Sequence, residues 1–154
     1  MSSYHIPVLA DRCIELLNIN PKGTYVDLTF GGGGHSSLIL EKLSKEGRLF
    51  AFDQDRDAEN NIPDDDRFNF VASNFKYLRG QLRLRGVEQV DGILADLGVA
   101  TATKAVERLR KVAREKKMQT TEEAREYLKM ILAEMLYIDD TALQLRTKPS
   151  VVLV

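Results

Sequence analysis

The sequence predicts an α/β fold, with a parallel half-sheet followed by an α-helical hairpin and a short C-terminal strand. Three observations predict it. Strand-like runs alternate with helical patterns over residues 1–99, four glycines follow the first run, and the composition changes abruptly near Val99. Because strands that alternate with helical connections run parallel through right-handed crossovers, we expect four parallel strands over residues 1–99.

The first 99 residues contain all ten glycines and all six phenylalanines. Apolar residues at helical spacing predict a helix over 8–17, and the Asn, Pro and Gly residues after it predict a break. The later elements expected here are strands over 24–30, 48–55, 67–73 and 90–98, helices over 35–47 and 75–86, and a polar connection over 56–66. We expect Gly47 to end the helix over 35–47.

The tail, residues 100–154, has a helical period. Apolar residues predict two amphipathic helices over 101–117 and 120–137, the second opened by a capping box of Thr120 and Glu123. The last residues, "KPSVVLV", predict a short strand. This strand could pair beside the fourth or the first strand as a fifth strand, or the hairpin could pack loosely as a separate unit. We therefore divide the chain into domains 1–99 and 100–154.

Length and charge limit the function. The length of 154 residues predicts about one domain, and the net charge of −1 does not indicate a strongly basic nucleic-acid module. Residues 1–99 carry a net charge of −4 and the tail carries +3. The single cysteine, Cys13, excludes an internal disulfide framework, and we expect it in the core. No signal peptide or apolar run of membrane-spanning length is present, so we expect a cytoplasmic protein without a membrane span.

The strongest chemical pattern is "VDLTFGGGGHSS". Asp27 lies on the first strand, and Gly31 and Gly33 follow at the turn into a helix. Glycines there allow positive φ and close approach of the backbone to a ligand, and the helix start favours a negative group. A phosphate-binding loop is not indicated, because Gly31 is followed five residues later by Ser36 and the motif's lysine is absent. The dinucleotide pattern fails because Ser36 stands at its last glycine.

This pattern is the one expected for S-adenosylmethionine, which has no pyrophosphate. A carboxylate can accept hydrogen bonds from both hydroxyls of a ribose, and Asp53 at the end of the second strand is placed to do so. Asp55 is the competing candidate. The structural alternative is a flexible glycine turn, with Asp53 capping the next helix.

Three further residues are candidates for the same site. Phe75 could stack on adenine or make a core contact. Asp96 follows the fourth strand, where it could contact the amine that receives a methyl group, or cap the next helix. Asp96 is a weak catalytic candidate, and the catalytic residues stay unknown. We expect His35 to orient the glycine loop rather than to act as a base. No metal site is expected.

Residues 4–99 resemble the N-terminal part of the ribosomal RNA small subunit methyltransferase H family. The motifs that carry the resemblance are "YHIPVL", "YVDLTFGGGGHSSLIL", "GRLFAFDQD", "NF" at 74–75 and "VDGILADLGV". The resemblance implies a Rossmann-like methyltransferase half-sheet with the strand order 3-2-1-4, an S-adenosylmethionine cofactor, and methylation of a cytosine N4 amine in small-subunit rRNA. It implies cofactor contacts at Gly33, Gly34, His35, Asp53, Phe75 and Asp96. Gly32 departs from the family, which often has arginine there.

After "DLGV" the sequence departs further from that family. The expected glutamine contact to the cofactor and the substrate-side elements do not follow. Residues 95–154 instead resemble the N domain of the bacterial signal-recognition-particle receptor, through "ADLGVATA", two helices and "PSVVLV". The chain stops before that family's phosphate-binding loop, so GTP binding is not expected. We interpret the chain as a hybrid joined across residues 95–100.

Two functional hypotheses follow. The first is an incomplete S-adenosylmethionine-dependent rRNA methyltransferase that binds cofactor, with little or no turnover by this chain alone. The second is a non-enzymatic hybrid or truncated fragment whose tail is an interaction module. In that case the basic helix 104–117, with seven basic and two acidic residues, would meet a partner or a membrane surface.

Overall fold

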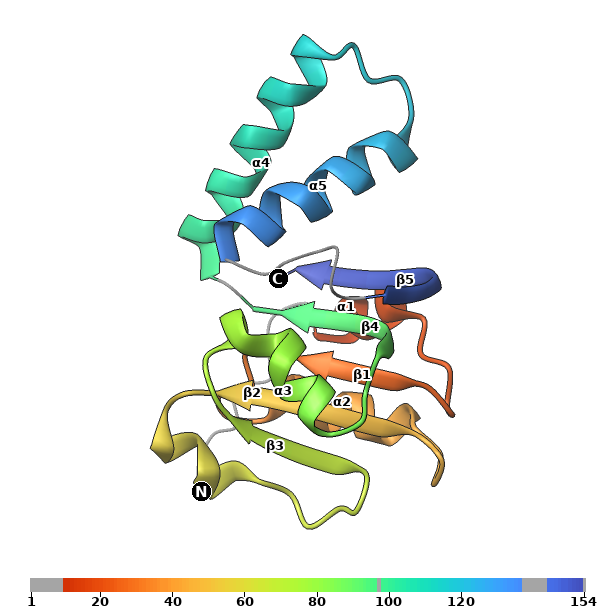
Figure 1. Ribbon diagram of the computed structural model, residues 1–154, viewed down its shortest axis with the longest axis vertical. Coiled ribbons are helices and arrows are strands. Elements are labelled where there is room, and N and C mark those ends of the chain that lie inside the picture. Colours follow the sequence, from red (N-terminus) through yellow and green to blue (C-terminus); the bar gives the residue numbers. More distant parts are fainter. Residues whose placement is uncertain (1–9, 97, 137–143, 154) are drawn as a thin grey trace.

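A computed structural model describes residues 10–96, 98–136 and 144–153. Five parallel strands form one sheet in the order β3-β2-β1-β4-β5 (Figure 1). The strands are β1 (Thr24–Asp27), β2 (Arg48–Asp53), β3 (Phe68–Ala72), β4 (Gln89–Ala95) and β5 (Gln144–Leu153). The predicted order 3-2-1-4 is confirmed, and the fifth strand lies beside β4 at the edge of the sheet.

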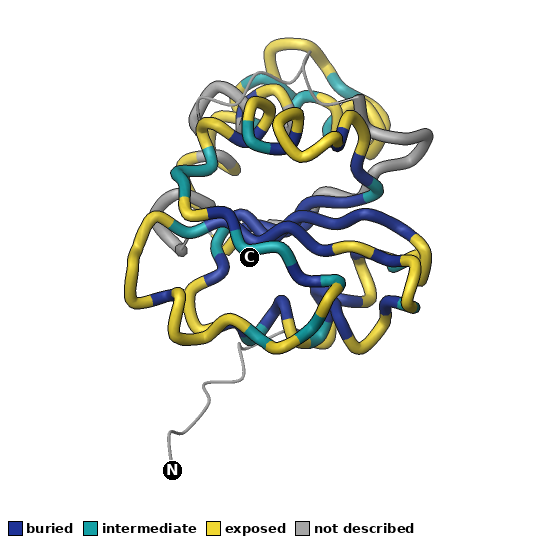
Figure 2. Tube along the Cα trace, turned by 60° about the horizontal axis from the view of Figure 1, so that its bottom comes forward, coloured by how far each residue is buried: buried dark blue, intermediate teal, exposed yellow. Residues whose placement is uncertain are grey.

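Helices cover both faces of this sheet. On one face, α1 (Ala10–Leu17) and α2 (Gly34–Lys42) pack with Tyr25, Leu49 and Leu94 in one buried cluster. On the other face, α3 (Leu78–Leu84) contributes Leu78 and Leu82 to a second cluster. Cys13 lies buried in the first cluster, as predicted. Figure 2 shows the strands buried in the middle of the molecule, because both faces are covered.

Helix α2 ends earlier than predicted. The sequence suggested a helix over 35–47 with Gly47 as its stop, but the helix ends at Lys42 and Leu43 is extended. Gly47 instead lies in the tight turn before β2, where a Cβ atom would lie 2.6 Å from the Pro21 carbonyl oxygen. Gly47 is therefore required by close backbone packing, not by the end of the helix.

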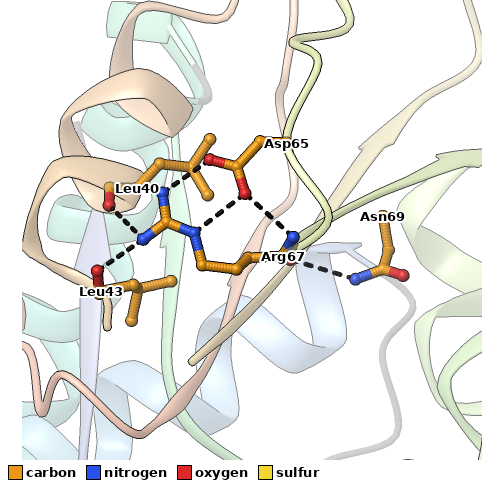
Figure 3. Close-up of polar contacts among 5 residues, drawn as sticks. All are labelled: Leu40, Leu43, Asp65, Arg67 and Asn69. Atoms are coloured by element: carbon orange, nitrogen blue, oxygen red, sulfur yellow. Dashed lines mark hydrogen bonds and ion pairs between the residues drawn. The ribbon is translucent and has the colours of Figure 1, made fainter. Parts of the chain in front are cut away.

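Arg67, just before β3, joins this end of α2 to the sheet (Figure 3). Its guanidinium donates hydrogen bonds to the carbonyl oxygens of Leu40 and Leu43 and to the carboxylate of Asp65. The side chain thus gives a donor to the Leu43 carbonyl just beyond α2, and a second donor to the Leu40 carbonyl, which also accepts the Leu43 N–H.

Two 3₁₀ turns occur beside the sheet. The predicted polar connection contains the first, η1 (Arg56–Asn61). The predicted helix over 75–86 begins instead as η2 (Phe75–Tyr77), capped by the Asn74 side chain, and continues as α3.

The tail forms the predicted helical hairpin of α4 (Gly98–Glu115) and α5 (Thr121–Leu136), which projects beyond the β5 edge of the sheet (Figure 1). The predicted capping box is confirmed. The Glu123 N–H donates to the Thr120 hydroxyl oxygen at 3.2 Å, and the Thr120 N–H donates to the Glu123 carboxylate. The predicted domain boundary after Val99 lies inside α4.

Strand β5 pairs parallel to β4, with Ile93 opposite Val151 and Leu94 opposite Val152. The register shifts between Val90 and Gly92, which face Leu145 and Ser150. Pro149 lies within this irregular stretch of an edge strand, where a missing N–H is tolerated. Val152 is buried in the α1–α2 cluster, so β5 shares the core of the sheet.

Candidate cofactor site

A cleft of about 380 Å³ lies at the carboxyl ends of β1, β2, β3 and β4. This is where open α/β sheets bind ligands, and the volume suits a nucleoside-sized molecule. Polar and apolar residues line the cleft: Leu28, Thr29, Gly31, Phe52, Asp53, Gln54, Ser73, Asn74, Phe75 and Asp96.

The glycine turn forms one wall. Gly31 and Gly33 have φ values of 51° and 82°, in the left-handed region that favours glycine. A Cβ atom at Gly33 would lie 3.1 Å from the Phe30 ring, so Gly33 is needed for packing. Gly31 and Gly32 face open space, because a Cβ atom would meet nothing nearer than 4.0 Å at either position. Their backbone is accessible to a ligand.

Asp53 joins the glycine turn to β2. One carboxylate oxygen accepts the Gly31 N–H at 2.8 Å, and the other accepts the Asp55 N–H at 2.8 Å. The Asn61 amide donates to the Gly31 carbonyl oxygen at 3.1 Å and holds the turn from η1. A carboxylate has about four acceptor sites, so two remain for a ligand.

Asp27 supports the turn from below. It is completely buried, and its carboxylate accepts the Ser36 hydroxyl at 2.7 Å and the Thr29 N–H at 3.0 Å. Burial raises the pKa of Asp27 because the charged form loses its hydration, while the two hydrogen bonds act in the opposite direction. Ser36, which excluded the dinucleotide pattern, therefore anchors the first turn of α2 to β1.

Thr29 ties the ends of β1 and β4 together. Its hydroxyl oxygen accepts the Asp96 N–H at 2.7 Å, so the Asp96 backbone is held at the cleft while its side chain is exposed. On the β3 side, the Asn74 amide donates to the Gln54 side-chain oxygen at 3.1 Å, next to Phe75.

The structure brings three predicted site residues together at the cleft: Asp53, Phe75 and Asp96. Asp55 does not line it. Asp55 caps η1 by accepting the Asp57 N–H, the role that the structural alternative gave to Asp53.

Gly33, Gly34 and His35 are not among the lining residues; they shape the turn and begin α2. His35 is buried, and its Nε2 atom has no hydrogen-bond partner within the described part of the chain.

Sequence reasoning did not single out Thr29, Gln54 and Asn74. All three lie inside the quoted motifs "YVDLTFGGGGHSSLIL", "GRLFAFDQD" and "NF", but none was assigned a role of its own. Their positions directly after strand ends could have indicated that they line the cleft.

The charge of the cleft restricts its ligand. Two carboxylates, Asp53 and Asp96, line it, and none of its lining residues is Lys or Arg. A pyrophosphate would be repelled by these carboxylates, whereas a cationic sulfonium would be attracted. The donor and acceptor set therefore fits S-adenosylmethionine better than a dinucleotide.

The sequence profile described as the MraW methylase family matches residues 2–108. The chain belongs to this family. Among curated proteins, it is 60% identical over 100 residues to a ribosomal RNA small subunit methyltransferase H from Porphyromonas gingivalis. It is 58% identical over 99 residues to the protein of that name from Bacteroides thetaiotaomicron. These matches cover 65% and 64% of this chain but 32% and 33% of the relatives, so the MraW-family chain spans about a third of their length.

Solved structures show the same fold. A candidate rRNA methylase from Clostridium thermocellum has a TM-score of 0.51 and 19% identity over 59% of this chain and 51% of its own. A protein-L-isoaspartate O-methyltransferase has a TM-score of 0.50 and 15% identity over 59% and 29%. These similarities establish the methyltransferase-like sheet alone.

These matches support the methyltransferase resemblance and give no support to the receptor resemblance of residues 95–154, which stays a prediction. In the described part of this MraW-family chain, no helix is long and apolar enough to cross a membrane. No group of three or more potential metal ligands occurs there either.

Proposed function

We propose that this chain is the cofactor-binding part of an S-adenosylmethionine-dependent methyltransferase that acts on cytosine N4 in small-subunit rRNA. One observation carries the proposal: the open glycine turn and the Asp53 carboxylate line the same cleft and are hydrogen-bonded to each other. The family and its ribosomal RNA methyltransferase relatives support the same activity.

Each residue has a role in this proposal. Asp53 accepts the two ribose hydroxyls, and Phe75 stacks on the adenine. Gly33, Gly34 and His35 shape the backbone that receives the methionine half. When bound, the cofactor supplies an electrophilic methyl group on a sulfonium. Asp96 lies where it could accept a hydrogen bond from the amine that is methylated, and its carboxylate favours the cationic ligand.

Cytoplasmic location and rRNA as a partner belong to this proposal. We expect cofactor binding without efficient turnover, because methyl transfer requires the amine to be held in line, about 3–3.5 Å from the reacting carbon. The described chain offers a cleft for the cofactor half of that geometry. The receptor-like hairpin as a non-enzymatic interaction module is the competing proposal.

Titration with S-adenosylhomocysteine tests the proposed function. At about 100 times its dissociation constant, the ligand should stabilise the fold by roughly 2.7 kcal/mol and raise the melting temperature. We expect Asp53→Ala to abolish binding in calorimetry, since it removes both the ribose acceptors and the Gly31 contact. Asp57→Ala removes an exposed carboxylate of η1 outside the cleft and should bind normally. Unchanged affinity in Asp53→Ala would remove Asp53 from the site.

A further inference from the structure

We propose that η2 and α3 form a docking surface for single-stranded RNA, in which Lys76, Arg79 and Arg83 bind phosphates and Tyr77 stacks on a base. The inference deepens the proposed function and rests on it, because it locates the RNA contact beside the cofactor cleft. It names residues that the cofactor site does not use.

The charge of this segment contrasts with the rest of the methyltransferase-like part. Residues 1–99 carry 11 Lys and Arg residues and 15 Asp and Glu residues, whereas residues 74–87 carry four basic residues and no acidic one. These four are Lys76, Arg79, Arg83 and Arg85, and all are exposed. A cluster of positive charges on an otherwise acidic part of the chain favours the binding of phosphates.

The packing of α3 fixes which side carries this charge. Leu78 and Leu82, one turn apart, are buried against the sheet. Arg79 and Arg83 each follow one of these residues, so they are neighbours on an exposed face of the same short helix. Two adjacent guanidiniums can hold successive phosphates of a backbone.

Tyr77 adds an exposed aromatic ring to this positively charged surface. It is 55% exposed although it is a large aromatic residue, and it belongs to neither buried cluster. The Lys76 ammonium lies 4.8 Å from the centre of its ring. An exposed ring beside cations is the usual platform on which proteins stack an unpaired base. The surface therefore favours RNA over an acidic protein.

Continuity with the cleft supports this placement. Phe75, the first residue of η2, lines the cleft, and Tyr77 follows two residues later. A base brought to the cleft would thus have its neighbouring nucleotides within reach of η2 and α3. By contrast, the basic residues of α4 begin at Lys104, and the helix leads away from the sheet (Figure 1). At 1.5 Å per residue, Lys104 lies about 9 Å along α4 from Gly98.

Fluorescence anisotropy with a fluorescein-labelled single-stranded RNA oligonucleotide tests the charges. Arg79→Gln/Arg83→Gln should weaken binding about tenfold and reduce the salt slope by about 1.4, since each lost phosphate contact contributes about 0.7. Lys42→Gln/Lys45→Gln makes the same charge change at the last residue of α2 and in the turn after it. Because α2 packs on the opposite face of the sheet, this variant should leave binding unchanged. Equal binding by the Arg79/Arg83 variant and the wild type would overturn the proposal.

The ring is tested separately. Tyr77→Phe keeps the stacking surface and should bind RNA like the wild type, whereas Tyr77→Ala should weaken binding by about 5- to 150-fold. Both variants change an exposed residue, and unchanged thermal unfolding would show that the fold is kept. If Tyr77→Ala has no effect and phosphatidylglycerol vesicles compete with equal dependence on Arg79 and Arg83, the surface binds membranes and the RNA proposal is overturned.

Two further measurements separate this inference from the proposed function. Loss of RNA binding in Arg110→Gln/Arg114→Gln, with normal binding in the α3 variant, would locate the RNA on α4 and overturn the inference. S-adenosylhomocysteine should raise the melting temperature of the α3 variants as it does for the wild type. If it fails to do so for the wild type while RNA binding still depends on α3, the proposed function fails and the docking surface stands.

Discussion

Asp27 shows at the scale of one residue how the cleft is supported. Its carboxylate is completely buried below the glycine turn and bridges β1 to the first turn of α2 through Ser36. Desolvation raises its pKa in the folded chain above the unfolded value, so the folded state binds a proton there more tightly than the unfolded state does. This contribution favours folding at acidic pH and is lost as the pH rises through the raised pKa.

We therefore expect Asp27→Asn to change the pH dependence of stability. The amide keeps an acceptor for the Thr29 N–H and carries no charge, so the variant lacks the cost of ionising a buried carboxyl. The difference in unfolding free energy should move in favour of the variant as the pH rises above the unfolded pKa of about 3.9. Urea denaturation between acidic and neutral pH measures it; a constant difference would contradict the raised pKa.

Thr29 provides a second prediction at this scale. Its hydroxyl accepts the Asp96 N–H and so holds the end of β4 at the cleft. Thr29→Val has nearly the same shape without that acceptor. It should weaken S-adenosylhomocysteine binding by about 2- to 10-fold, which corresponds to one hydrogen bond of about 0.5–1.5 kcal/mol. Thr29→Ser should retain most of the affinity in calorimetry, and equal loss in both variants would point to packing instead.

At the scale of elements, Arg67 joins α2 to β3 through a contact that no local sequence pattern predicts. The Arg67 guanidinium caps the end of α2 and pairs with Asp65 at 2.6 Å, which lowers the pKa of Asp65 and raises that of Arg67. Since the folded pKa of Asp65 is depressed, its contribution to stability is present above the unfolded pKa. That contribution is lost as the pH falls through the folded pKa.

Arg67→Ala should therefore lower the melting temperature near neutral pH, because the Leu40 and Leu43 carbonyls and the Asp65 carboxylate lose their hydrogen bonds to the guanidinium. The melting temperature of Arg67→Lys should lie between those of Arg67→Ala and the wild type. A lysine ammonium cannot donate to all three groups in the planar geometry of the guanidinium. The Lys22–Glu46 pair is exposed, and Lys22→Ala serves as a control that should change the melting temperature little. An equal change in both alanine variants would show that the cap is not stabilising.

Element type could be predicted from the sequence where the period is strong, as in the strands and the tail helices. The early end of α2 could not, because it depends on Arg67, 24 positions beyond Leu43, and on the turn that Gly47 closes. In the same way Asp53 was recognisable as an acid ending a strand. Thr29 and the Gln54–Asn74 pair were not, since their roles depend on which strand ends lie side by side.

For the whole molecule, the decisive feature is that β5 pairs with β4. From the sequence, the last strand could pair with the fourth strand or the first, or the hairpin could pack as a separate unit. The apolar pattern alone does not select a pairing partner. The ladder from Gly92–Ser150 to Ala95–Leu153 makes the tail part of one sheet, and α1 packs against the added strand. Helices α4 and α5 form the long connection that two parallel neighbouring strands require. The tail and the first four strands therefore share one sheet and one core.

Stability of the methyltransferase-like part should consequently depend on the tail. Val152 is 5% exposed within the α1–α2 cluster, so Val152→Ala should lower the free energy of unfolding by about 1–3 kcal/mol through lost burial and a residual cavity. Leu84→Ala removes more apolar atoms, but at a side chain that is 81% exposed, and should have little effect. Urea unfolding should show one transition for both variants if β5 and the four other strands unfold together. A Val152→Ala chain as stable as the wild type would instead mean that the tail adds nothing to the core, and that the first four strands are stable without their fifth neighbour.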